Sequence, residues 1–96
     1  MEFDMNLIRE LRELAANGVA PSKLVLLIGN RLEIDGADFR LQAIAYFREA
    51  FHLSLADAKR IGAASAFPGG NREDGDVDQE VVSVIKNTEH LWRNQR

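Results

Sequence analysis

Hydrophobic residues recur every three or four positions along most of the chain, which is the spacing of amphipathic α-helices. The clearest segment is 39–62, FRLQAIAYFREAFHLSLADAKRIG, which predicts two helices joined at a two-residue break around His52 and Leu53. No stretch alternates apolar and polar residues strongly enough to predict a strand. The length of 96 residues suits one core, because two cores would each be too small to stand alone. The pattern therefore predicts an all-α fold, a single compact domain of about five helices over residues 1–96.

Capping and breaking residues define the first two predicted helices. The first is expected from about Asp4 to Ala16 and is ended by Asn17-Gly18, because glycine accepts the left-handed conformation that closes a helix. The second is expected to open at Pro21, whose fixed φ suits a first turn, and to stop at Asp35-Gly36. Gly29 inside this helix lowers its propensity by about 1 kcal/mol relative to alanine. Its predicted benefit is close packing by a neighbour.

The third and fourth helices make up the 39–62 segment. The third is expected over about 37–51, with its main apolar row facing the core and Tyr46 near the edge, where its hydroxyl can reach water. The fourth begins with a capping box, in which the Ser54 oxygen accepts from the N–H of Asp57. Leu55 is expected to face inward together with Ala58 and Ile61. Losing the Ser54 cap is expected to cost about 1 kcal/mol.

The segment 62–75 is the only long irregular stretch, rich in glycine and proline, and the last helix is expected to follow it from near Asp76 to about Asn94. Loops of this length are uncommon in small domains and are often functional. The last helix carries a continuous apolar stripe that ends with Leu91 and Trp92. We expect this stripe to complete the core.

Composition favours a soluble protein of a reducing compartment. Hydrophobic residues make up 46% of the chain and charged residues 28%, which is enough for a core and argues against intrinsic disorder. The chain has no cysteine, so a disulfide framework and a thiolate site are excluded. Acidic residues interrupt the first fourteen positions, unlike a signal peptide or a membrane span. We therefore predict a cytoplasmic protein with no membrane contact.

Acidic residues cluster before and at the predicted start of the last helix. They suit two interpretations: a solvated loop with favourable charges at a helix N-terminus, or a docking surface for a basic partner protein, on which carboxylates speed association. Tyr46 and Trp92 are additional candidates for the aromatic anchor that such an interface normally needs. The candidate partner-binding residues are Phe67, Arg72, Glu73, Asp74, Asp76, Asp78 and Glu80.

Candidate chemistry is sparse. Glu49 and His52 have the Glu-x-x-His spacing of carboxylate di-metal bundles, but such a site needs a second motif, which the adjacent Glu89 and His90 do not supply. The segment 68–71, PGGN, has no strand before it and therefore does not predict a nucleotide-binding loop. We predict a protein that is not an enzyme and uses no metal or cofactor.

A helix-turn-helix regulator is the alternative from another functional class. The spacing of the first two helices around 17–23 resembles that of DNA-reading motifs, and the pair joined at His52 gives a second candidate. However, the stretch Leu24 to Ile28 is too apolar to lie in a DNA groove, and the formal net charge is −3. We therefore expect no nucleic-acid partner. A self-associating helical module is a third interpretation, which predicts a large apolar patch and a dimer.

Two segments resemble known families. Residues 53–61, LSLADAKRI, resemble a helix of the C-terminal domain of the bacterial ribosomal stalk protein, but the strands that surround that helix have no counterpart here. The wider segment 45–55, AYFREAFHLSL, followed by a Gly/Pro-rich loop and a terminal helix bearing Trp92, is similar to small bacterial immunity proteins of contact-dependent or type VI toxin systems. This resemblance covers about half the chain. It implies a cytoplasmic protein that binds and neutralises a cognate toxin, which we expect to be a basic domain.

Overall fold

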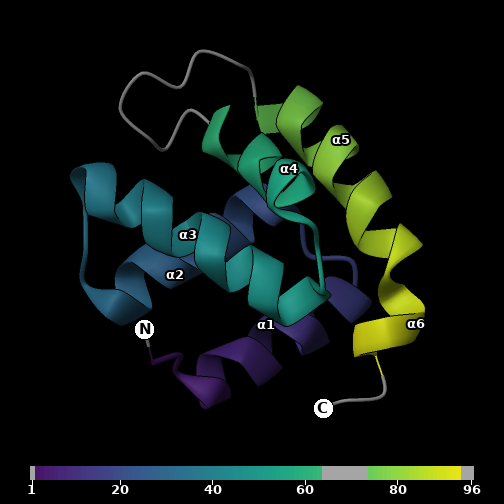
Figure 1. Cartoon of the computed structure of the whole chain (residues 1–96), viewed down its shortest axis with the longest axis horizontal. Helices are drawn as coiled ribbons and strands as arrows, with labels where there is room; N and C mark the ends of the chain where they lie inside the picture. The colour runs from purple at the N-terminus through teal and green to yellow at the C-terminus, as the bar shows by residue number, and fades with distance from the viewer. Residues whose placement is uncertain (1, 64–73, 94–96) are drawn as a thin grey trace.

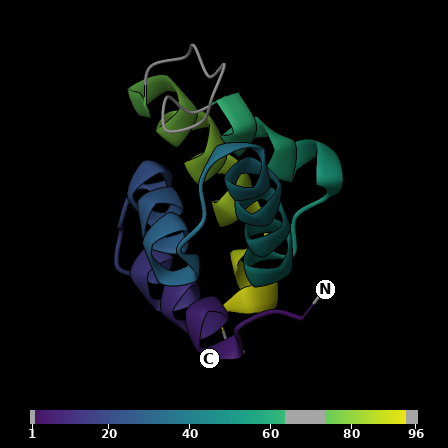
Figure 2. The same cartoon turned by 90° about the vertical axis from the view of Figure 1, so that its left-hand side faces the viewer.

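Helix α3 (Gly36–Phe51) lies at the centre of the fold, and the other helices pack around it (Figures 1 and 2). The structure is a computed structural model that describes residues 2–63 and 74–93. The surrounding helices are α1 (Met5–Ala16), α2 (Pro21–Leu32), α4 (Leu55–Ala58), the 3₁₀ helix η1 (Lys59–Ala63), α5 (Asp74–Asn87) and α6 (Glu89–Trp92). Within the described residues no strand is present. The predicted all-α single domain is confirmed.

The core is built from the apolar rows that the sequence predicts. Helix α3 contributes Phe39, Ala43, Phe47 and Ala50, all of them buried, together with Phe51. Helices α1, α2 and α5 bury their own apolar residues in the same core, and α3 contacts α1, α2, α4, η1 and α6. Apolar residues that recur with the helical period in the sequence are therefore the residues that are buried in the structure.

Three predicted helix boundaries are confirmed. Asp4 is the N-cap of α1, and its carboxylate accepts from the backbone N–H of Asn6 and of Leu7. Pro21 opens α2 as its first residue. Ser54 caps α4 by accepting from the N–H of Asp57 at 3.1 Å. Each boundary follows from a local hydrogen-bonding or dihedral preference, which is why the sequence alone locates it.

The close packing predicted at Gly29 is also confirmed. A Cβ added to Gly29 would lie 2.9 Å from Cζ of Phe39, which is closer than side-chain carbons approach one another in proteins. The ring of Phe39 therefore occupies the space that any other residue would fill. The glycine that weakens α2 locally allows α2 and α3 to pack closely.

The end of α2 differs from the prediction. Helix α2 stops at Leu32 because Glu33 adopts the left-handed conformation with φ of +55°, before the Asp35-Gly36 pair. The N–H of Ile34 then donates to the carbonyl of Gly29 at 3.3 Å, which is the long hydrogen bond of a Schellman ending. His52 closes α3 in the same way with φ of +52°. Both endings place a residue other than glycine in the left-handed conformation, and the end of α3 at Phe51 is where the sequence predicts it.

The last predicted helix is divided. Helix α5 ends at Asn87, and the short helix α6 begins after Thr88. The carbonyl of Ile85 accepts hydrogen bonds from the backbone N–H of Thr88 and from the indole Nε1 of Trp92. These two contacts take the place of the hydrogen bond that a continuing α-helix would make to this carbonyl. The Thr88 hydroxyl also donates to the carbonyl of Phe51 at 2.7 Å. The break joins α5 to the end of α3 and places Trp92 against Phe51, with ring centroids 5.1 Å apart.

Three predicted orientations are wrong. Tyr46 is 2% exposed rather than at a wet edge, and its hydroxyl accepts from the backbone N–H of Asp4 at 2.8 Å. Leu55, expected to face inward, is 46% exposed, whereas Ala58 and Ile61 are buried as predicted. Leu91, expected in the buried stripe, is 45% exposed. Helical periodicity identifies an apolar face but does not say whether another element covers all of it.

Candidate functional site

The predicted acidic docking surface lies only partly within the described residues. Phe67, Arg72 and Glu73 fall outside the described residues, and Asp74 is described only as the first residue of α5. Of the remaining members, Asp76 is exposed, whereas Asp78 and Glu80 are half-buried. Both half-buried carboxylates contact other parts of the chain.

Asp78 binds the N-terminus of α2. Its Oδ1 accepts from the backbone N–H of Ser22 at 2.7 Å, and its Oδ2 accepts from the Ser22 hydroxyl at 2.8 Å. The N-cap residue of α2 is Ala20, whose side chain cannot accept a hydrogen bond. A carboxylate from α5 therefore serves as the cap that α2 lacks, at the positive end of the helix dipole.

Glu80 pairs with Arg60 of η1, and the same guanidinium also contacts Asp57 at 3.3 Å. The hydrogen bond to Glu80, and then that to Asp57, raise the pKa of the Arg60 guanidinium above its ordinary value. All three side chains are near the surface, so the contribution of the network to stability is small. Asp57 thus binds Arg60 through its carboxylate and Ser54 through its backbone N–H.

The two aromatic candidates that can be described are core residues. Tyr46 is 2% exposed and Trp92 is 1% exposed. The ring of Tyr46 contacts Phe3 edge-on at 5.0 Å, and the Trp92 indole packs on Phe51. Neither ring can act as an interface anchor without unpacking the core.

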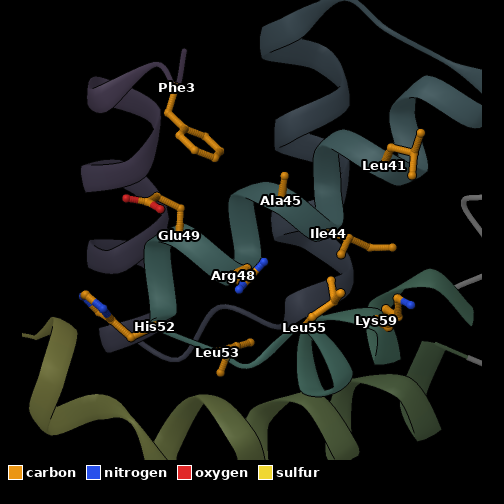
Figure 3. A pocket seen from close by; sticks show the side chains of 10 residues that line it. All are labelled: Phe3, Leu41, Ile44, Ala45, Arg48, Glu49, His52, Leu53, Leu55 and Lys59. Atoms are coloured by element: carbon orange, nitrogen blue, oxygen red, sulfur yellow. The ribbon is translucent and has the colours of Figure 1, made fainter. Parts of the chain in front are cut away.

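The outer face of α3 carries a groove, which we call the α3–α4 groove. Its volume is about 650 Å³. Figure 3 shows its side chains, which come from α3, from α4 and the segments beside it, and from the N-terminal segment. The lining residues are Phe3, Leu41, Ile44, Ala45, Arg48, Glu49, His52, Leu53, Leu55 and Lys59.

The groove exists because α3 is apolar on two faces. Its inner face forms the core row, and Leu41, Ile44 and Ala45 continue apolar surface onto the outer face. Leu41 is 63% exposed, and Leu55 of α4 is 46% exposed. Scattered single leucines are normal on a protein surface, but these two contribute to one concavity. The sequence does indicate such a surface, because α3 has more apolar residues than a single buried face can hold.

Two cations border the groove without ionic partners. The side chains of Arg48 and Lys59 form no ion pair or hydrogen bond with any residue in 2–63 or 74–93, and both residues are exposed. Arg31 and Arg93, by contrast, pair with Glu10 and Glu89. The positive charge at the groove is therefore not neutralised by the described part of the chain.

The opposite end of the groove carries Glu49, and Arg12 of α1 lies close to it, with its Nη2 donating to the backbone carbonyl of Glu49 at 3.4 Å. Arg12 is 6% exposed, and its Nε donates to the carbonyl of Ala50 at 2.7 Å. Burial lowers the pKa of the Arg12 guanidinium, and the Glu49 carboxylate acts in the opposite direction. Sequence reasoning did not identify Arg12 as a core residue, because an arginine at this helical position looks solvated until its carbonyl partners at the end of α3 are known.

Glu49 and His52, which carry the Glu-x-x-His spacing, both line the groove (Figure 3). Among residues 2–63 and 74–93, no group of three or more histidine, aspartate and glutamate side chains is placed to hold a metal ion. We therefore describe the pair as part of the polar end of the groove.

The structure gives the helix-turn-helix alternative no support. Helix α2 buries Leu24, Val25 and Ile28, so this face cannot enter a DNA groove. Helix α4, the second helix of the other candidate pair, is a single turn of four residues. A recognition helix lies in the major groove and needs a longer exposed face with several base-contacting side chains.

Comparison of the chain with protein-family models, with curated proteins and with solved structures finds no match. Within the described helices, none has the length and apolar character needed to cross a bilayer.

Proposed function

We propose that this protein is a non-catalytic binding domain that holds a partner protein in the α3–α4 groove. One observation carries the proposal: Leu41 and Leu55 are 63% and 46% exposed, and both line a concavity of about 650 Å³. Apolar side chains in a polar-rimmed concavity are typical of protein interfaces, where burial of such anchors supplies most of the binding energy. Burying an exposed leucine contributes about 1.5–3 kcal/mol.

The biological role that we propose is that of a cytoplasmic immunity protein, which binds a cognate secreted toxin and blocks its active or substrate-binding surface. Two observations support this role. The segment 45–55, which resembles immunity proteins, contributes Ala45, Arg48, Glu49, His52, Leu53 and Leu55 to the groove. The net charge of −3 and the exposed Asp76 favour a toxin that is basic overall, because long-range attraction speeds association.

The test is co-purification with the product of the adjacent gene, followed by calorimetric titration of the purified pair. The variant Leu41→Gln/Leu55→Gln removes two exposed apolar contacts and is expected to weaken binding at least about tenfold. Its matched control is Leu26→Gln/Leu91→Gln, because these leucines are 55% and 45% exposed and do not line the groove. The control is expected to bind as the wild type does.

Two outcomes would contradict the proposal separately. An adjacent gene product that is not a toxin, or that does not bind, would overturn the immunity role. A toxin that binds the Leu41→Gln/Leu55→Gln variant as tightly as the wild type would overturn the groove as the binding surface. Circular dichroism of both variants establishes that each retains its helices.

A further inference from the structure

We infer that the segment held in the α3–α4 groove is an amphipathic helix of the partner that carries carboxylates beside its apolar anchors; this inference rests on the function proposed above. The charge of the groove supports it. Arg48 and Lys59 have no ionic partner among the described residues, whereas Glu49 lies close to the buried Arg12. Carboxylates on the bound segment would supply the missing partners.

The shape of the groove favours a helix. Its α3 side runs from Leu41 to His52, eleven positions further along the chain, which spans about 17 Å at a rise of 1.5 Å per residue. That length matches about three turns of a bound helix, whose apolar anchors recur at positions i, i+3 or i+4, and i+7. Ala45 lies midway, where its small side chain permits close approach of the helix.

Apolar and charged residues alternate across the groove, which constrains where the carboxylates of the ligand can lie. Leu41, Ile44 and Leu55 are apolar lining residues, and Arg48 and Lys59 are the cations. In the view of Figure 3, Leu55 lies between Arg48 and Lys59. Carboxylates on the two sides of an apolar anchor that packs on Leu55 would therefore each lie near one cation. This local requirement is compatible with a toxin that is basic overall, because Asp76 lies on α5, outside the groove.

The test uses two synthetic amphipathic peptides of about fifteen residues. Both carry leucine at the same i, i+3 and i+7 positions, and their flanking positions are glutamate in one peptide and lysine in the other. Each peptide is titrated into the full-length ¹⁵N-labelled protein at low salt, and amide shifts are followed by NMR. We expect the glutamate peptide to shift amides within 41–59 and to bind about tenfold more tightly than the lysine peptide, with the difference shrinking as salt is added.

A matched pair of variants tests the two cations. Arg48→Gln/Lys59→Gln is expected to remove most of the preference for the glutamate peptide. Arg9→Gln/Lys23→Gln removes two exposed cations that do not line the groove and is expected to leave the preference intact. Glutamine keeps good helix propensity, so both variants are expected to fold.

Several outcomes would overturn the inference. Equal binding of both peptides at the groove would exclude selection for carboxylates and leave the proposed function standing. Shifts outside the groove, or no shift with either peptide, would exclude an acidic helix as the occupant, and the toxin titration would still decide the proposed function independently. A concentration-dependent dimer that is lost in Leu41→Gln/Leu55→Gln would show that a second copy fills the groove.

Discussion

The carboxylate of Asp78 in α5 accepts two hydrogen bonds from Ser22 in α2, one from its backbone N–H at 2.7 Å and one from its hydroxyl at 2.8 Å. The two residues are 56 positions apart in the sequence. This contact supplies the side-chain cap that Ala20 cannot provide, and it also joins α2 to α5. An acidic residue that the sequence suggests as part of a docking surface therefore has a structural function.

Replacing Asp78 with alanine is expected to destabilise the protein by about 1–2 kcal/mol, because the N–H of Ser22 loses its acceptor and α2 loses a favourable charge at its N-terminus. Urea denaturation followed by circular dichroism measures the change. Asp76→Ala is the control, because Asp76 is exposed on the same helix. A loss of stability at Asp76 equal to that at Asp78 would contradict the specific cap.

Gly29→Ala is expected to destabilise the protein by about 1 kcal/mol, although alanine has the higher helix propensity. The added methyl would lie 2.9 Å from Cζ of Phe39, and overpacking of a core generally costs more than the propensity gain returns. Gly75→Ala in α5 is the control, because nothing lies within 4 Å of its added Cβ. It is expected to stabilise the protein slightly. Thermal unfolding of the two variants should give shifts of opposite sign.

Tyr46→Phe is expected to cost about 1–2 kcal/mol. The buried hydroxyl is the acceptor for the backbone N–H of Asp4, and its removal leaves that N–H without this partner at the start of α1. Hydrogen exchange is expected to accelerate at the first amides of α1 more than at those of α5. Uniform acceleration across the protein would show that the loss is global and that the hydroxyl does not specifically anchor α1.

Glu33→Gly is expected to stabilise the protein by about 0.5–1 kcal/mol. Glu33 has φ of +55°, a left-handed conformation in which glycine carries no steric penalty from a Cβ. Denaturant titration measures the gain. Asn30→Gly, at an exposed position inside α2, is expected to destabilise by a similar amount, because glycine there only increases the entropy lost on folding. If both changes destabilise the protein, the left-handed conformation of Glu33 carries no steric penalty that glycine could relieve.

Asp76→Asn is expected to slow association with a basic partner and to weaken the dependence of the association rate on salt, with little change in folding stability. Stopped-flow mixing with the purified product of the adjacent gene, the proposed partner, measures the rate. Glu13→Gln, an exposed acid on α1, changes the net charge equally and is the control. Identical rates for both variants would leave Asp76 as a solvated residue at a helix start.

The sequence predicted the helices well because local rules define them. Asp4, Pro21 and Ser54 mark helix starts by hydrogen bonding or by fixed φ. The α3–α4 groove was missed because α3 has apolar residues on two faces, and periodicity does not show which face receives a neighbour. The exposed position of Leu55 follows from the short length of α4, which leaves its N-terminal residue beside the groove.

The amino-acid sequence by itself determined that this protein is helical, where most of its helices begin, and which helix faces are apolar. Those properties depend on residues within a few positions of one another. Tertiary structure alone decided that Tyr46 is buried, that Asp78 caps α2, and that α5 breaks at Thr88 to place Trp92 on Phe51. These features join residues far apart in the chain, and their energies depend on helix packing that no local pattern specifies.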